Sequence, residues 1–354
     1  MKTVAIIGAG ITGSMVAWYG QKLGLDVHVY EPDNNKTSCS YTAAGMLAPM
    51  AELERASDAV YKMGRRSLQL WPDILARLNG PVFYKNNGTL VVSHRQDRGT
   101  FNVFLNTLKE KLSNQFDSQC DVFERQTLEP ELSHLGSSLW LKNEAQVDSH
   151  QALNALHQHL KSNAHWHTQK VGHITPYEVG DKKFDWVFDC RGLAAAKDIE
   201  GLHGVRGEVI EVHAPQVNIN HMIRVMHPRY RIYIVPRENH HYLIGATEIQ
   251  SDDNGPVSVR SCLELLSAAF SVHSGFAEAR IIEMRSGVRP TALHHQPVID
   301  HREGLTRING LYRHGYLLAP AVAEKVWDVM AKTLKIPMND STKKIKEGLH
   351  EHSC

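Results

Sequence analysis

The chain has little that would direct it to nucleic acid, a membrane or an oxidising compartment. Lys and Arg number 39 against 38 Asp and Glu, a formal net charge of +1, so neither a basic surface nor an acidic tail is predicted. The five cysteines lie far apart without a CxxC pair, as is usual in a reducing compartment. No apolar run approaches the ~20 residues of a membrane span. The apolar start after Lys2 breaks at Gly8, too early for a signal peptide. These absences predict a soluble cytoplasmic protein without nucleic-acid or membrane partners.

Histidine is plentiful, with 22 residues, but its spacing along the chain does not predict a metal site. Separations of one or two residues form neither an i, i+4 helical pair nor a Cys/His box. Solvated or partly buried histidines are therefore favoured, and no metal is expected. The close pairs are His157/His159, His165/His167, His240/His241 and His294/His295.

What the chain does have is a nucleotide fingerprint in its first 31 residues. An apolar strand is followed by GAGITG over 8–13, a helical stretch, and a second strand that ends at Glu31. Gly8 allows a tight turn, Gly10 lets the backbone approach a pyrophosphate, and Gly13 lets the helix pack close to the strand. The pyrophosphate would lie on the helix N-terminus, and Glu31 would accept hydrogen bonds from a ribose diol. These features predict adenine-dinucleotide binding.

The rest of the chain alternates between helical and strand-like segments. Helices are predicted at 59–78, with a break or new start at Pro72, at 101–116, at 149–163 capped by Ser149, and at 258–270 capped by Ser258. Residues 83–93 are predicted to form two strands joined at an Asn-Gly turn. Further strands are predicted at 186–190, 208–213, 230–236 and 242–246, and a strand-like stretch at 310–318 precedes a helix through Leu334. The polar residues 335–354 are expected to form a loosely held tail.

This order of elements predicts an α/β protein with discontinuous domains. A Rossmann-like nucleotide domain is assigned to 1–80, 145–206 and 285–334. An inserted α+β domain with a mainly antiparallel sheet is assigned to 81–144 and 207–284, and would hold the substrate.

Three further segments carry chemistry. SYTAAGMLAP, at 40–49, is a run of small residues that lets backbone pass close to a flat ring system. In GVRP, at 287–290, Arg289 sits on a stiff local backbone, and its guanidinium matches a carboxylate bidentately; a surface ion pair is the alternative. GLYRHGYLLAP, at 310–320, places a glycine-marked turn before an apolar helix, a second candidate anion site.

With IYIVPR at 232–237 and LIGATE at 243–248, these motifs resemble the D-amino-acid-oxidase-like flavoproteins, and among them the glycine oxidases of thiamine biosynthesis. The resemblance runs in order from Met1 to about Leu334. It implies FAD as the cofactor and oxidation of a C–H bond next to an amine. Neither Cys39 nor Cys190 lies in a motif that matches a covalent flavin link, so the FAD is expected to be noncovalent.

The resemblance also implies residue roles. Arg289 would bind the substrate carboxylate, and Tyr233 would add a hydrogen bond to it. The small-residue segment and the turn at 313–315 would lie against the flavin. The predicted cofactor-binding residues are Gly8, Gly10, Ile11, Thr12, Gly13, Glu31, Ala43, Ala44, Gly45, Met46, Val171, Gly192, Arg313, His314, Gly315, Tyr316 and Leu317.

The expected reaction needs no general base at the substrate α-carbon. A neutral amine held by its carboxylate would lose a hydride to flavin N5, with orientation as the protein's contribution, and oxygen would reoxidise the flavin to give hydrogen peroxide. A small glycine-like amino acid and oxygen are the expected partners, serving thiamine thiazole synthesis. Alternatives are another amine (sarcosine or a D-amino acid), a dehydrogenase with a carrier as acceptor, and a flavoprotein that modifies a partner protein, which would not need Arg289. A homo-oligomer is a further expectation.

Overall fold

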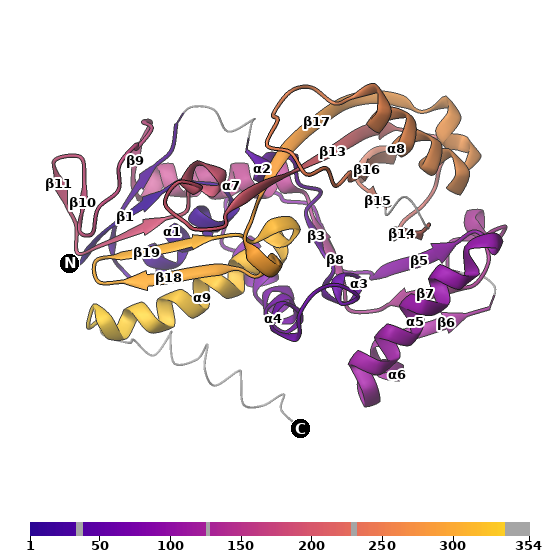
Figure 1. Ribbon diagram of the computed structural model, residues 1–354, viewed down its shortest axis with the longest axis horizontal. Helices are drawn as coiled ribbons and strands as arrows, with labels where there is room; N and C mark the ends of the chain where they lie inside the picture. The colour runs from indigo at the N-terminus through magenta and orange to yellow at the C-terminus, as the bar shows by residue number, and fades with distance from the viewer. Residues whose placement is uncertain (33–37, 125–127, 228–231, 337–354) are drawn as a thin grey trace.

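The computed structural model describes residues 1–32, 38–124, 128–227 and 232–336. A six-stranded sheet lies at one end of the molecule, an eight-stranded sheet lies at the other, and a small three-stranded sheet lies between them (Figure 1). This arrangement confirms the α/β fold class, with a Rossmann-like sheet and a second, mainly antiparallel one. No helix of the described residues is both long and apolar enough to cross a membrane.

The six-stranded sheet has the order β18-β19-β12-β1-β2-β9, and all its strands are parallel except β18. Its central residues Val4, Ala5 and Ile6 are fully buried, as expected of parallel strands covered on both faces. The strands are β1 Thr3–Ile7, β2 Asp26–Tyr30, β9 His165–His167, β12 Trp186–Asp189, β18 Val298–Arg302 and β19 Leu305–Asn309.

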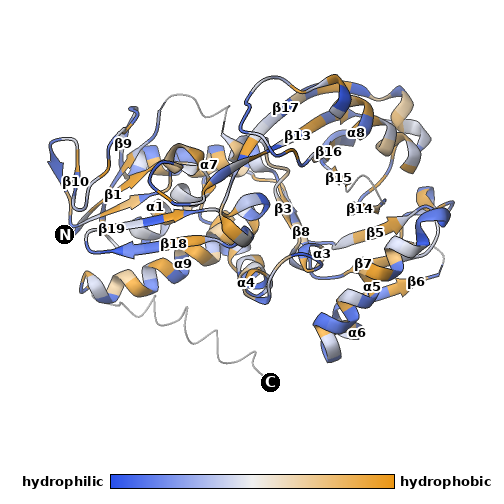
Figure 2. Ribbon diagram, in the orientation of Figure 1, coloured by the Kyte–Doolittle hydropathy of each residue, from blue (hydrophilic) through white to orange (hydrophobic). Residues whose placement is uncertain are grey.

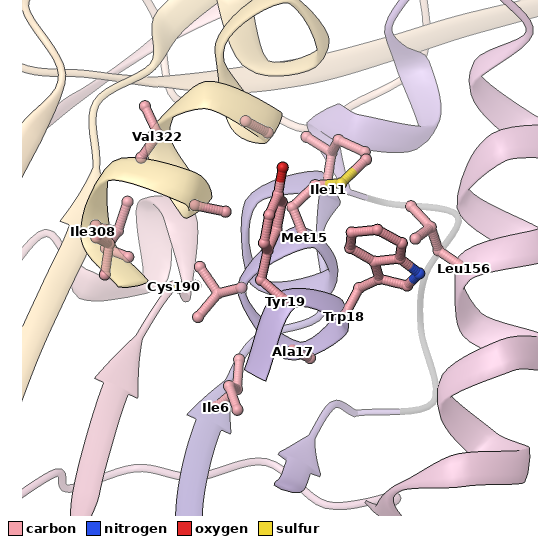
Figure 3. Close-up of a cluster of buried hydrophobic side chains, with 14 of the residues drawn as sticks. Ile6, Ile11, Met15, Ala17, Trp18, Tyr19, Leu156, Cys190, Ile308 and Val322 are labelled. Carbon is pink, nitrogen blue, oxygen red and sulfur yellow. The ribbon is translucent and has the colours of Figure 1, made fainter. Parts of the chain in front are cut away.

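Three helices cover one face of this sheet: α1 Ile11–Lys22, α7 Ser149–Asn163 and α9 Gly315–Thr333. Figure 3 shows α1 between the other two, with Met15 and Trp18 packed near Ile6 of β1, Leu156 of α7 and Val322 of α9. In Figure 2, α9 alternates between apolar and polar colours along its length, consistent with one face turned to the sheet and one to solvent.

The other face is covered by a small hairpin formed by β10 Glu178–Val179 and β11 Lys182–Lys183. Val179 and Phe184 pack there against Ile7 and Tyr30. Along β2, Val27 and Val29 therefore face the helices, whereas the alternate residues face the hairpin.

The eight-stranded sheet has the order β17-β13-β16-β15-β14-β5-β7-β6 and is antiparallel except for the β14–β5 pair. Successive residues of β5 enter different cores: Val91 packs with helix α5, and Leu90 and Val92 pack with helix α8. The elements are β5 Thr89–Ser93, β6 Cys120–Phe123, β7 Ser138–Leu141, β13 His203–His213, β14 Met222–Met226, β15 Ile232–Pro236, β16 His241–Gly245, β17 Arg280–Thr291, α5 Arg98–Leu112, α6 Phe116–Gln119 and α8 Val259–Val272.

The middle of the molecule joins the two large sheets. It holds β3 Met46–Leu47, β4 Tyr84–Lys85, β8 Ala145–Val147, α2 Cys39–Thr42, α3 Pro49–Glu52 and α4 Asp58–Leu75. The long strands β13 and β17 pair from His203↔Thr291 to His213↔Arg280 and run without interruption across the predicted boundaries at 206/207 and 284/285. The division into two domains at those positions stays a prediction.

Two local predictions are wrong because distant partners decide the outcome. The strands on either side of Gly88 do not form a hairpin: β4 pairs with β8, whereas β5 pairs with β14 and β7. Gly88 does have the positive φ of a turn, 85°, but it sends the chain into another sheet. Helix α4 continues through Pro72 to Leu75. The proline lies in the last turn, so the one backbone hydrogen bond that it cannot donate is lost only near the end of the helix.

Two helix starts also differ from the prediction. Helix α7 is capped by Asp148, whose carboxylate accepts from Gln151 N at 2.9 Å, rather than by Ser149. The predicted strand-like stretch at 310–318 is instead a short turn that follows β19, and the start of α9 at Gly315. The cap at Ser258 is confirmed. Residues 337–354 of the predicted tail lie outside the described residues, as do residues 230 and 231 of the strand predicted at 230–236.

Candidate active site

A cavity of about 1290 Å³ opens at the carboxyl ends of the parallel strands and extends to the eight-stranded sheet. The residues that follow β1, β2, β12 and β19 all line it, including Gly8, Glu31, Gly192 and Gly310. Ligands of open α/β sheets bind at this edge. The volume exceeds the roughly 300–1,000 Å³ of ordinary small-molecule sites, so a dinucleotide and a small substrate can share it.

The nucleotide end of the cavity requires its glycines. Gly8 has a φ of 90°, and a Cβ there would lie 2.7 Å from the Cys190 carbonyl oxygen. A Cβ on Gly13 would lie 1.8 Å from the Gly8 carbonyl oxygen, so Gly13 permits the close contact between α1 and β1 that the sequence predicts. Gly10 lines the cavity at the start of α1. This close backbone approach fits a pyrophosphate on the N-terminus of α1.

Glu31 stands beside this loop and accepts a hydrogen bond from Ala9 N. Burial raises the pKa of the Glu31 carboxyl, and the Ala9 amide opposes that rise. A carboxylate in this place, directly after β2 and in the cavity wall, fits the ribose diol of a dinucleotide. The residues present therefore fit an adenine dinucleotide on geometry alone.

The small-residue segment lies farther along the cavity, with Ala43, Ala44, Gly45 and Met46 in its wall. Gly45 has a φ of 67°, and a Cβ there would lie 1.9 Å from the Val147 carbonyl oxygen. The segment thus packs against β8 on one side and lines the cavity on the other.

Arg237, the last residue of IYIVPR, supports this segment from the protein side. Its guanidinium donates to the Ala44 carbonyl and to Gln146, and it lies 3.5 Å from an Asp148 carboxylate oxygen. Sequence reasoning did not single out Arg237 as a separate residue. A buried arginine bonded to the backbone of a cavity-lining segment is a positioning element rather than a ligand-binding one.

Arg289 lies half-buried in the cavity wall. Its Nη1 donates to the Thr247 carbonyl at 3.1 Å, and no carboxylate of the described residues lies within 4.0 Å of it. Burial and the nearby Arg313 lower the pKa of Arg289 below that of a solvated arginine. The guanidinium rests over Gly207, where a Cβ would lie 2.1 Å from Nη2. Arg289 is therefore a cation in the cavity wall without a carboxylate in ion-pair contact, although Glu248 lies near enough to raise its pKa.

Four other buried or half-buried arginines in this region are each paired with a carboxylate. The pairs, with the distance between nitrogen and carboxylate oxygen, are Arg313–Glu52 at 3.2 Å, Arg206–Asp253 at 3.1 Å, Arg224–Glu54 at 2.7 Å and Arg285–Glu211 at 3.3 Å. The contrast singles out Arg289 as the group that needs an external carboxylate.

Glu52, at the end of α3, is another charged residue in the cavity wall near Arg313, and the sequence analysis did not predict it. Its carboxylate accepts from the Tyr233 hydroxyl at 2.8 Å and pairs with Arg313. Burial would raise the pKa of Glu52, but Arg313, His314 and Arg224 lower it to about 2. Burial lowers the pKa of His314 to about 4, so at pH 7 Glu52 is ionised and His314 is neutral.

Most predicted site residues meet in this one cavity. Gly13 does not line it, because its role is packing, and Val171 packs instead against the cluster that holds Ile7 and Tyr30. The cofactor contact of Val171 stays a prediction. The predicted residues in the cavity wall are Arg289, Tyr233, Gly8, Gly10, Ile11, Thr12, Glu31, Ala43, Ala44, Gly45, Met46, Gly192, Arg313, His314, Gly315, Tyr316 and Leu317.

Comparisons with known proteins point the same way. Residues 3–328 match the DAO family, described as FAD dependent oxidoreductase. A protein of Rhizobium etli that carries the name of a thiamine biosynthesis oxidoreductase, ThiO, is 37% identical over 327 residues, which covers 91% of this chain and 94% of that protein.

Two solved structures share the fold. The glycine oxidase of Geobacillus kaustophilus superposes with a TM-score of 0.81 at 22% identity, covering 94% of this chain and 95% of that one. The iminodiacetate oxidase IdaA of Chelativorans sp. BNC1 superposes with a TM-score of 0.76 at 23% identity, covering 91% and 93%.

Proposed function

This chain belongs to the family of FAD-dependent oxidoreductases, and from that premise we propose that it oxidises a small glycine-like amino acid to the imino acid. The chemistry that bound FAD supplies is acceptance of a hydride at N5 from the substrate α-carbon, with reoxidation by oxygen to hydrogen peroxide. The relative named ThiO supports a place in thiamine thiazole synthesis.

The observation that carries the proposal is Arg289. It is a half-buried guanidinium in the cavity wall, with a backbone carbonyl as its hydrogen-bond partner and no carboxylate within 4.0 Å among the described residues. A desolvated guanidinium without an anion binds an incoming carboxylate strongly, since two parallel N–H donors match its two oxygens. An amino acid supplies that carboxylate, whereas a simple amine does not.

A second polar group, the Tyr233 hydroxyl, would orient the rest of the substrate. The Tyr233 hydroxyl donates to Glu52 at 2.8 Å, so its oxygen offers lone pairs to a substrate N–H. By rotating about its C–O bond, the same hydroxyl can instead donate to the substrate carboxylate, the role that the sequence predicts. Arg313 holds Glu52 in place through two nitrogens, at 3.2 and 3.3 Å from the carboxylate oxygens. These contacts hold the polar groups that would orient the substrate, and orientation is the protein's main contribution to a hydride transfer.

The start of α9 supplies a fixed electrostatic element. Gly315, Tyr316 and Leu317 line the cavity at the N-terminus of this helix, where the positive end of the helix dipole favours negative charge. Noncovalent binding of FAD is supported by the two cysteines in the cavity wall, Cys39 and Cys190. Burial raises the pKa of both the Cys39 and the Cys190 thiols, which keeps them protonated and unreactive.

The test is an anaerobic screen of amines against the FAD-loaded protein, with flavin absorbance as the readout. Glycine, sarcosine, D-alanine and methylamine are compared, and we expect the amino acids to bleach the flavin and methylamine to leave it yellow. Bleaching by sarcosine faster than by glycine would favour the second candidate, an N-substituted glycine, as the name of the structural neighbour IdaA suggests for that protein.

Variants of Arg289 separate the substrate role from a structural one. Arg289→Lys keeps the charge but loses the fork, so kcat/KM is expected to fall by about 100-fold while the flavin spectrum stays. Arg66→Lys is the matched control, since Arg66 makes the same two-nitrogen contact with Glu324, at 2.8 and 2.7 Å, away from the cavity. Equal effects of the two substitutions on kcat/KM would place Arg289 in a structural role.

A further inference from the structure

Outside the cavity, two histidines and an aspartate gather on the sheet face below the β10–β11 hairpin. Asp26 and His28 are two residues apart on β2 and so share one face. His165 lies on the edge strand β9, directly opposite His28 in the parallel register. Residues far apart in sequence are thereby brought side by side, an arrangement that spacing along the chain does not show.

The ligand atoms of these three residues lie within 4.8 Å of one another. An Asp26 carboxylate oxygen is 3.1 Å from His165 Nε2, and its other oxygen is 3.6 Å from His28 Nε2. Ligand atoms of a tetrahedral zinc ion at about 2.0–2.2 Å stand about 3.3 Å apart, so the Asp26 oxygen beside His165 Nε2 is already close to that spacing, and the 4.8 Å limit leaves a short adjustment for the third ligand atom. The His28 and His165 rings are nearly parallel, and His165, whose side chain is 61% exposed, has room to turn toward a shared ion.

A fourth residue makes a hydrogen bond with His28. His28 Nδ1 lies 2.8 Å from His167 Nε2, and His167 is the next residue along β9 on the same face. A metal-binding histidine commonly donates its other N–H to a neighbour, which leaves the ligating nitrogen free. With the Nδ1 proton donated to His167, His28 Nε2 would keep its lone pair for an ion.

The positively charged side chain of Lys182 also lies beside His28. Lys182 Nζ, on the hairpin strand β11, lies 3.0 Å from His28 Nε2. Because Nζ also lies 3.2 Å from His28 Nδ1, it sits against the ring beside both nitrogens, and its positive charge opposes a metal ion at Nε2. Lys182 is exposed, and the hairpin strand that carries it has only two residues, so the side chain can swing away.

We infer that Asp26, His28 and His165 form a binding site for a divalent transition-metal ion of the zinc class, with His167 as the hydrogen-bond partner of His28 and water as the fourth ligand. Two imidazole nitrogens and one carboxylate oxygen suit Zn²⁺ and not Mg²⁺. The ion ties the edge strand β9 to β2. Glu31 N donates to the His167 carbonyl at 3.1 Å just beyond the site, so the same clamp steadies the strand end that carries Glu31.

The experiment uses the FAD-loaded protein, treated with a chelator and then titrated with Zn²⁺ against a chromophoric chelator. One equivalent is expected to bind tightly. His165→Gln and Asp26→Asn should each lower the affinity at least about tenfold, and Lys182→Met should raise it, since the competing cation is gone. Both His165 and Lys182 are exposed, so these variants are expected to fold. The unfolding temperature should rise with Zn²⁺ in the wild type and not in His165→Gln.

The many other histidines call for a matched control. His241 makes a contact of the same length, 3.1 Å from a Glu211 carboxylate oxygen, but without a third ligand in the described residues, so His241→Gln should leave zinc affinity unchanged. Zinc binding or thermal stabilisation that is the same in the wild type, His165→Gln and Asp26→Asn would overturn the assignment. An unchanged affinity in Lys182→Met would refute the position of the ion at His28 Nε2.

Discussion

Glu144 offers a prediction whose size follows from its surroundings. Its side chain is fully buried directly before β8, and its carboxyl accepts from Ala51 N at 2.7 Å. Burial raises the pKa of Glu144 from the ordinary 4.5 to about 7, against the hydrogen bond from Ala51 N, which lowers it. At about 1.4 kcal/mol per tenfold difference in proton affinity, this rise corresponds to about 3 kcal/mol.

The sign follows from proton linkage. Below pH 4.5 both the folded and the unfolded chain hold this proton, so the group has no net effect. Between 4.5 and about 7 the unfolded chain loses the proton while the folded chain keeps it, and the free energy of unfolding falls. Above about 7 the loss is complete and constant. Glu144→Gln removes the titration and keeps an oxygen for Ala51 N, so the variant should gain about 3 kcal/mol on the wild type across this range.

Urea unfolding of the FAD-loaded wild type and of Glu144→Gln, at half-unit steps from pH 4.5 to 8.5, measures this difference. Glu110→Gln on the exposed side of α5 is the control, and its difference from the wild type should stay flat with pH. A flat difference for Glu144→Gln as well, within about 0.5 kcal/mol, would show that the carboxyl titrates as a solvated group and would refute the reasoning from burial.

Three other substitutions test the two ends of the cavity. Gly207→Ala puts a methyl group where the Arg289 guanidinium rests, so KM should rise about tenfold or more, with an unchanged flavin spectrum; an unchanged KM would mean that the guanidinium moves aside freely. Glu31→Ala should weaken FAD by about 1.5–3 kcal/mol, the worth of a hydrogen bond to a charged group, measured by flavin release during dialysis; equal retention would remove Glu31 from the site. Tyr233→Phe removes the donor to Glu52 and should raise KM with a modest change in kcat; a loss of stability without a kinetic change would leave Tyr233 as a packing residue.

The nucleotide end of the site could be predicted from the sequence because its parts are contiguous. Gly8 and Gly10 lie in the turn between β1 and α1, Gly13 lies in the first turn of α1, and Glu31 follows the next strand. The contact of Gly13 with the Gly8 carbonyl is set by residues a few positions away, and only the space at Gly8 is also limited by a distant group, the Cys190 carbonyl. Such a motif can be recognised from adjacent residues.

Predictions failed where a distant segment chose the partner. The Asn-Gly turn at Gly88 has the expected backbone, yet the strands on its two sides join different sheets because β8 and β14 compete for them. The residues of a turn predict that the chain bends there, but they do not predict which strands pair with each other. The helix through Pro72 is a similar case, since the packing of α4 on α9 stabilises the last turn despite the proline.

The arrangement of the substrate end and that of the proposed metal site could not be predicted from the sequence for the same reason. Glu52, Tyr233, Arg289 and Arg313 come from α3, β15, β17 and the turn before α9, and no interval along the chain relates them. Two of them were predicted to bind substrate through family resemblance, and Glu52, which no quoted motif contains, was missed. In the same way, the register of two parallel strands, His28↔His165, creates the histidine cluster. The spacing of residues along the chain can exclude a metal site only where a single helix or loop supplies all its ligands. Sites assembled across a sheet become visible only with the strand order and the register.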